Sequence, residues 1–85
     1  MKIRITKSEF DLIEDLLDNK QFYFIAKSIN SSEMILVFHD TDKSLKFDEL
    51  IKDKLVYQGF DIDYNLNPFG QMCENVIDKM YEILN

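Results

Sequence analysis

Oxygen-bearing side chains alternate along one short segment, at Asp61, Asp63 and Asn65. Asp and Asn with this spacing begin the calcium-binding loop of an EF-hand. That loop also needs a Gly at its sixth position and a bidentate Glu at its twelfth, where this sequence has Leu66 and Met72. The strict alternation with apolar residues predicts a strand instead. We therefore expect no calcium site here, and no metal site elsewhere in the chain.

The single histidine and the single cysteine offer little further chemistry. A zinc site needs about three or four ligands, and His39 has no second histidine to join it. We expect His39 to lie at the surface at the end of a strand. Cys73 shares one face of a helical pattern with Val76 and Ile77, and burial there disfavours the reactive thiolate. Cys73 is therefore predicted to be an inert core residue.

Carboxylates occur in pairs, such as Asp11 with Asp15 and Asp61 with Asp63. Hydrolytic acid–base chemistry requires one carboxyl group of a pair to be desolvated, so that its pKa rises. These acids lie on the polar sides of the expected elements, where water solvates them. The two glycines form no cluster that could cradle a phosphate. We therefore expect a non-enzymatic protein without a cofactor.

The size and composition predict one small domain. The chain has 85 residues, 46% of them hydrophobic, which is enough for one thin core without disulfides. We take residues 1–85 as a single domain. One cysteine cannot form an internal disulfide, and the N-terminus has no apolar run of signal-peptide length. The longest apolar run, at 34–38, is too short for a membrane helix. These features predict a cytoplasmic protein.

The net charge bears on the class of partner. A formal charge of −6 argues against direct binding to nucleic acid, because its phosphates repel an acidic chain. No window clusters Lys and Arg as a nucleic-acid or membrane-surface site requires. Lysine far outnumbers arginine and Trp is absent, which is typical of AT-rich bacterial or phage genomes. We expect neither nucleic acid nor membrane as a partner, and a bacterial or phage origin.

The first half of the chain predicts a strand, a helix and a hairpin. Residues 2–6 alternate polar and apolar, so they form a short strand or lead directly into the helix. Thr6 and Glu9 have the spacing of a capping box, and the apolar periodicity continues to Asp18, with Asn19 as a left-handed helix end. Residues 21–29 and 33–39 are two β-type runs joined by a polar turn. Residues 40–44 are expected to form a polar loop.

The second half predicts a helix, a strand and a longer helix. Apolar spacing indicates a helix over 45–57, closed at Gly59. Residues 60–67 alternate strictly, as in a strand with one buried face. Asn67 and Pro68 suit the N-cap and first position of the last helix.

The expected order is (β)αββαβα, which belongs to the α+β class. If the first strand forms, residues 2–66 follow the element order of a ferredoxin-like fold, with an extra C-terminal helix. If it does not, a three-stranded antiparallel sheet packed by helices is the alternative. The sheet is thus expected to have three to four strands. Element order alone carries no function, because such folds host many unrelated activities.

Two surfaces are candidates for partner binding. Five acids and no base lie between residues 9 and 18, and this stripe would steer a basic partner. The last helix has an apolar arc of about 180°, broader than the ~100° stripe of a typical surface helix. Solubility explains the acids equally well, and core packing explains the arc. The candidate partner-binding residues are Asp11, Glu14, Asp15 and Asp18 in the acidic stripe, and Met72, Met80 and Tyr81 on the arc.

The leading hypothesis is a small acidic protein-binding domain, an adaptor or inhibitor, that acts without catalysis and either alone or as a homodimer. A second hypothesis is an acidic mimic of nucleic acid that inhibits a DNA- or RNA-binding protein. The chain resembles small acidic phage-encoded inhibitors in size and charge alone. A third hypothesis is a small-ligand-binding domain, or a small enzyme, with a pocket between helix and sheet.

Overall fold

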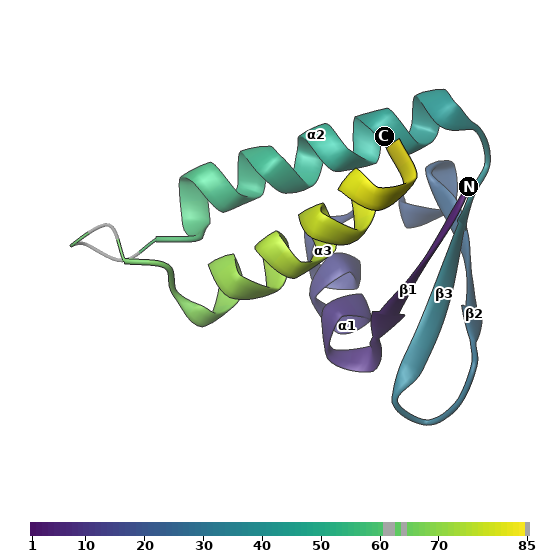
Figure 1. The fold of residues 1–85 in the computed structure, drawn as a ribbon, viewed down its shortest axis with the longest axis horizontal. Helices are drawn as coiled ribbons and strands as arrows, with labels where there is room; N and C mark the ends of the chain where they lie inside the picture. The colour runs from purple at the N-terminus through teal and green to yellow at the C-terminus, as the bar shows by residue number, and fades with distance from the viewer. Residues whose placement is uncertain (61–62, 64, 85) are drawn as a thin grey trace.

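Three antiparallel strands form a sheet that three helices cover on one face (Figure 1). The computed structural model describes residues 1–60, 63 and 65–84. The α+β class and an antiparallel sheet of three to four strands are confirmed, and the strand at residues 2–6 forms as one of three. In chain order the elements are β1 (Lys2–Thr6), α1 (Lys7–Leu16), the short 3-10 helix η1 (Lys20–Phe22), β2 (Phe24–Ser28), β3 (Glu33–Phe38), α2 (Thr41–Gln58) and α3 (Pro68–Leu84).

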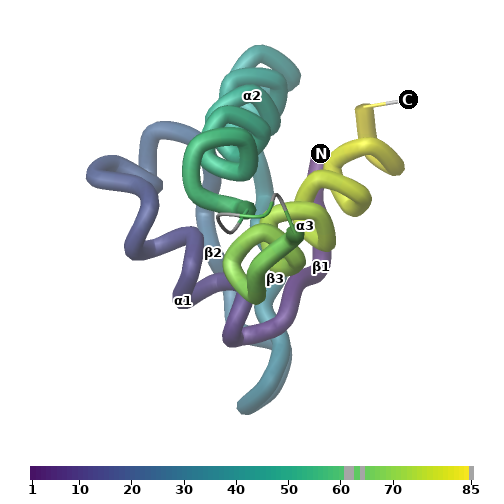
Figure 2. The backbone as a smooth tube through the Cα atoms, turned by 90° about the vertical axis from the view of Figure 1, so that its left-hand side faces the viewer, coloured from purple at the N-terminus to yellow at the C-terminus, as the bar shows by residue number. Residues whose placement is uncertain are grey.

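The strand order is β1-β3-β2, with β3 in the centre. In the pairing register Ile3 lies opposite Leu36, which lies opposite Ala26. Opposed residues share a face of the sheet, so this row points toward the helices, where Ile3 and Leu36 are buried. α1, α2 and α3 all lie on that side (Figure 2). None of the described helices lies against the other face of the sheet.

α1 begins as the sequence predicts and ends earlier. Thr6 Oγ1 accepts a hydrogen bond from Glu9 N–H, and the Glu9 carboxylate accepts one from Thr6 N–H, which completes the capping box. The helix stops at Leu16 because Leu17 is extended. Asn19 has a φ of −139°, so the predicted left-handed helix end is wrong. Leu17 is buried in the core, so the chain leaves α1 at this residue in an extended conformation.

Two predicted boundaries are also corrected. Residues 21–23 were expected in the first strand of the hairpin, but η1 occupies Lys20–Phe22 and β2 begins at Phe24. The predicted loop 40–44 is the first turn of α2, because the Asp40 carboxylate accepts a hydrogen bond from Lys43 N–H and caps the helix. The fully buried Ser44 hydroxyl donates to the Thr41 carbonyl in that turn.

The predicted strand at 60–67 is not seen as a continuous strand. Phe60 and Leu66 pair with each other in an isolated antiparallel bridge, and neither residue belongs to the three-stranded sheet. Residues 61, 62 and 64 lie outside the described residues. The described part of the chain therefore contains three sheet strands, and the fourth strand that the ferredoxin-like order requires is not among them.

Two glycines bring α2 and α3 close together at this end of the molecule. A Cβ on Gly70 would collide with the carbonyl oxygen of Gly59, and one on Gly59 would lie 3.1 Å from Gly70 Cα. Gly59 caps α2 as predicted, with a φ of −84°, so close approach rather than φ requires glycine. Asn67 Oδ1 accepts from Gly70 N–H at 2.7 Å, which confirms the predicted N-cap of α3.

The core lies between the sheet and the helices and is centred on α2. The fully buried Phe47 ring contacts the rings of Tyr23, Phe24 and Phe38, with centroids 5.2–6.3 Å apart. Edge-to-face and tilted contacts of this kind are the favoured aromatic geometries. Among the described helices, none is both long and apolar enough to cross a membrane.

Candidate partner-binding surface

The predicted acidic stripe on α1 is partly neutralised. Asp11 forms an ion pair with Lys7 at 3.1 Å, and Glu14 forms one with Lys20 at 2.6 Å. Within the described residues, Asp15 and Asp18 have no ion-pair partner, and both are exposed. The stripe is therefore weaker as an electrostatic surface than the sequence suggests, because two of its four predicted residues already face a lysine.

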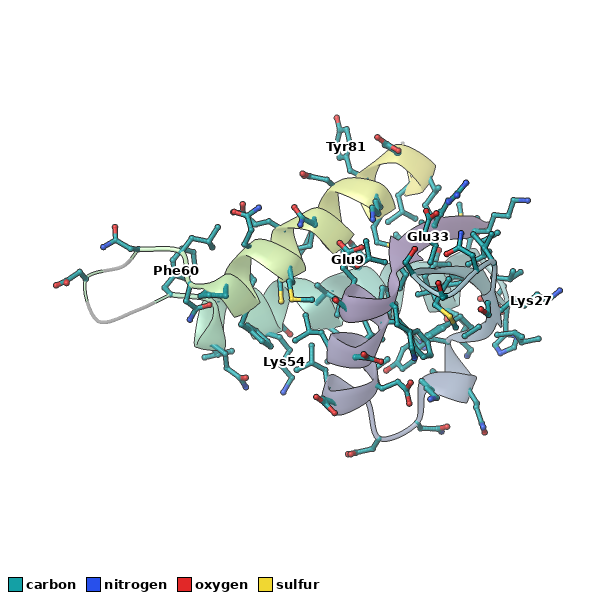
Figure 3. All side chains as sticks on the ribbon, turned by 90° about the horizontal axis from the view of Figure 1, so that it is seen from below. Glu9, Lys27, Glu33, Lys54, Phe60 and Tyr81 are labelled. Atoms are coloured by element: carbon teal, nitrogen blue, oxygen red, sulfur yellow. The ribbon has the colours of Figure 1, made fainter. Side chains whose placement is uncertain are left out.

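Glu9 belongs to the interior and not to this stripe. Its carboxylate accepts a hydrogen bond from Lys79 Nζ of α3 at 2.8 Å, and its side chain is only 5% exposed. Figure 3 shows Glu9 beside α3. Burial alone would raise the pKa of Glu9, but the hydrogen bonds from Lys79 and Thr6 outweigh it and lower that pKa. This ion pair therefore joins α1 to α3, and Glu9 does not add to the exposed acidic stripe.

The residues predicted on the arc of α3 divide between core and surface. Met80 has no exposed surface and packs in the core, which corrects its assignment to a contact surface. Met72 is half-buried. Tyr81 is 67% exposed and points away from the helix (Figure 3). Tyr81 borders a shallow groove of about 280 Å³ with Leu45 and other residues of α2 and α3.

The structure keeps the histidine, the cysteine and the carboxylates apart. His39 is exposed at the end of β3, and its Nε2 lies 2.7 Å from the carbonyl oxygen of Gln21. Cys73 is fully buried, as predicted, and burial raises the pKa of its thiol. In the described ranges no three His, Cys, Asp or Glu side chains lie close enough to hold a metal ion. Asp61, in the calcium-like segment, lies outside the described residues.

The face of the sheet away from the helices is apolar in the middle. One row across the sheet is Lys2, Val37 and Ile25, and the next is Arg4, Ile35 and Lys27. Ile25 is 54% exposed, while Ile35 and Val37 on the central strand are half-buried. We call the side chains of this surface the outer sheet face, and they are Lys2, Arg4, Ile25, Lys27, Glu33, Ile35 and Val37.

The outer sheet face is bordered by positive charge. Arg4 donates two hydrogen bonds to Glu33, at 2.6 and 2.8 Å, and with Asn30 it lowers the pKa of Glu33 to about 2. Lys2 and Lys27 have no ion-pair partner among the described residues. Lys27 points away from the body of the molecule (Figure 3). This face is therefore cationic, although the whole chain carries a charge of −6.

A groove runs along the free edge of β2, next to the outer sheet face. It has a volume of about 530 Å³. Ile25 from one face of β2 and Phe24 and Ala26 from the other all line it, which places the groove at the strand edge. Phe10 of α1 lies against it, and the Lys20 Nζ stands 5.3 Å from the Phe10 ring centroid. We call this hollow the β2 groove.

Neither surface was among the sequence-based candidates. The available signal was the continuous apolar run at 34–38, because a strand with apolar residues on both faces is typically covered on both.

No protein-family model, curated protein or solved structure matches this chain.

Proposed function

We propose that this protein is a non-enzymatic protein-binding module and that the outer sheet face is its binding surface. The observation that carries the proposal is the uncovered side of β3. Ile35 and Val37 are apolar residues of the central strand, and they lie on the face of the sheet that none of the described helices covers. Burying such residues against a partner is favourable by roughly 25 cal/mol per Å² of apolar surface removed from water.

Charge indicates the chemistry of the partner. Lys2, Arg4 and Lys27 border the apolar centre, with Glu33 as the one acid of the outer sheet face. Complementary charges at the rim of an interface raise association rates and select the partner. We therefore propose an acidic partner, in place of the basic one expected from the α1 stripe.

The size of the surface favours a single segment over a second copy of the chain. Three strands of about five residues span roughly 14 by 17 Å. That area, ~240 Å², is well below the ~800 Å² that each side of a typical stable complex buries. Two copies meeting through this face would also bring their unpaired lysines together. An acidic, amphipathic segment of another protein fits both the area and the charge.

The cytoplasmic location stays a prediction.

The test compares matched charge reversals in affinity capture from the native host. Lys27→Glu reverses a charge on the outer sheet face, whereas Lys46→Glu reverses another exposed charge, on α2. We expect a protein that the wild type and the Lys46 variant retain and the Lys27 variant loses. Equal retention by all three would contradict the proposal. Steep loss of the captured protein with salt, together with a nucleic-acid-binding identity, would favour the nucleic-acid-mimic hypothesis instead.

A further inference from the structure

The hydrogen bonds at the two ends of the hairpin fix which groups of β2 bond to β3. His39 N–H donates to the Tyr23 carbonyl at 3.2 Å, and Ile29 N–H donates to the Glu33 carbonyl at 3.0 Å. Hydrogen-bonded and non-hydrogen-bonded pairs alternate along an antiparallel ladder. The odd-numbered residues of β2 therefore bond to β3.

The even-numbered residues of β2 direct their main-chain groups to the open edge of the sheet. These are the N–H and C=O groups of Phe24, Ala26 and Ser28. No main-chain or side-chain hydrogen bond reaches these groups from the described residues. An edge of this kind is a template for an added strand. The orientation of these groups suits a ligand with an extended backbone.

The β2 groove lies directly beside this edge and offers space for side chains. An added strand would place alternate side chains on the helix side of the sheet, next to Phe10, Phe24 and Ala26. Phe10 and Phe24 are buried aromatic residues, so this wall of the groove is apolar. Side chains at these alternate positions are therefore expected to be apolar.

The remaining side chains of an added strand would lie on the outer sheet face, next to Lys27. Lys27 is the one cation of β2, and it has no ion-pair partner in the described ranges. An acidic residue opposite it would form a cross-strand pair. The sequence that fits therefore alternates apolar and acidic residues.

The other edge of the sheet is less suitable. Thr6 N–H of β1 is already bound by the Glu9 carboxylate. The groove beside β1 is smaller, about 310 Å³, and the charged residues Lys79 and Glu82 line it. β1 therefore offers fewer free donors and a more polar wall than β2.

We infer that the β2 edge binds an extended segment of a partner protein by strand addition, with apolar side chains in the β2 groove and acidic ones opposite Lys27. The inference rests on the proposed function and specifies how the partner is held. Strand addition uses main-chain hydrogen bonds for affinity and alternate side chains for specificity.

The first test uses the unmodified protein. Linear peptides selected from a random-sequence display library are sequenced, and one is resynthesised with N-methyl groups on alternate amides, in two complementary sets. Only one edge of an added strand faces β2, so we expect one set to weaken binding by about tenfold or more and the other to leave it unchanged. Equal effects of the two sets, or apolar residues spaced three and four apart, would overturn strand addition.

The second test removes a donor from the protein. In Ala26→Pro the lost N–H faces the open edge, so the β2–β3 ladder is kept. We expect this change to weaken binding of the selected peptide by about tenfold or more. The control, Thr41→Pro, places proline at the first position of α2, where it is tolerated, and should leave binding unchanged. Circular dichroism confirms folding of both variants.

The outcomes separate this inference from the proposed function. If Lys27→Glu abolishes capture of the host protein but Ala26→Pro does not, strand addition fails and the protein-binding function stands. If no peptide is enriched and no host protein depends on Lys27, both fail, and β2 is an edge that Lys27 protects from aggregation. A dimer that Ala26→Pro dissociates would show that a second copy occupies the edge, and would also overturn the inference.

Discussion

The ion pair between Glu9 and Lys79 provides a quantitative test of how the helices are held together. Replacing Lys79 with Met keeps most of the side-chain length and removes the charge. The Glu9 carboxylate, 5% exposed, would then keep its hydrogen bond from Thr6 N–H but lose its cationic partner. An uncompensated charge in such a place is costly, because methionine supplies no charge to replace the lost ammonium group.

The magnitude follows from the burial of the two partners. Breaking a fully buried ion pair by removing one partner costs about 3–5 kcal/mol. Lys79 is 33% exposed, so water can partly take its place, and we expect a loss of about 2–3 kcal/mol for Lys79→Met. With a urea m-value of about 1 kcal/mol/M for a small domain, the midpoint falls by roughly 2–3 M.

The pH dependence has a definite sign. In the wild type the pKa of Glu9 lies below its ordinary value, so the ionised carboxylate stabilises the fold above about pH 4.3 and this contribution is lost as pH falls through the folded pKa. In the variant the ammonium group no longer lowers the pKa of Glu9, so this pKa is higher than in the wild type. The stability difference between the two proteins should therefore be largest near neutral pH and should shrink at acidic pH.

The assay is urea unfolding followed by far-ultraviolet circular dichroism, at neutral pH and at about pH 3.5, below the ordinary pKa of Glu. Lys46→Met serves as the control, because its pair with Asp42 is exposed and should contribute less than about 1 kcal/mol. Adding Glu9→Gln to Lys79→Met should recover about 1–2 kcal/mol, since the buried charge is then removed. A loss below about 0.5 kcal/mol for Lys79→Met, or one independent of pH, would refute the reasoning.

Three further predictions follow from the packing and capping. Gly70→Ala should lower the free energy of unfolding by about 1–3 kcal/mol, because the added methyl group meets the Gly59 carbonyl; an unchanged thermal midpoint would contradict this close approach. Asn67→Ala should cost about 1 kcal/mol in urea unfolding through loss of the α3 N-cap. The buried Cys73 thiol should react with a chromogenic disulfide reagent only as fast as the protein opens; rapid reaction in native buffer would show that the thiol is accessible.

The sequence alone determined the elements whose signals are local. The capping box of Thr6 and Glu9, the N-cap at Asn67 and the apolar periodicity of α1 and α3 each depend on residues a few positions apart, so a pattern suffices to find them. The hairpin was likewise found from two β-type runs and a polar turn, with its first boundary displaced by η1.

Such local patterns could not predict contacts between residues that lie far apart in the sequence. Glu9 and Asp11 look alike in the sequence, but one is buried against Lys79, 70 residues away, and the other is exposed beside Lys7. Met80 and Tyr81 are neighbours on α3, yet one lies in the core and the other at the surface. The strand prediction for 60–67 went wrong at its described ends for the same reason, since Phe60 pairs with Leu66 and neither residue belongs to the three-stranded sheet.

The candidate site was decided by tertiary structure. The sequence fixes that β3 is apolar on both faces and that Lys27 lies at an odd position of β2. It does not fix that all three helices pack on one side, which leaves Ile35 and Val37 on the uncovered side. That choice depends on the summed burial of the inner residues around Phe47, and burial energy is a property of the assembled layers and not of any local pattern.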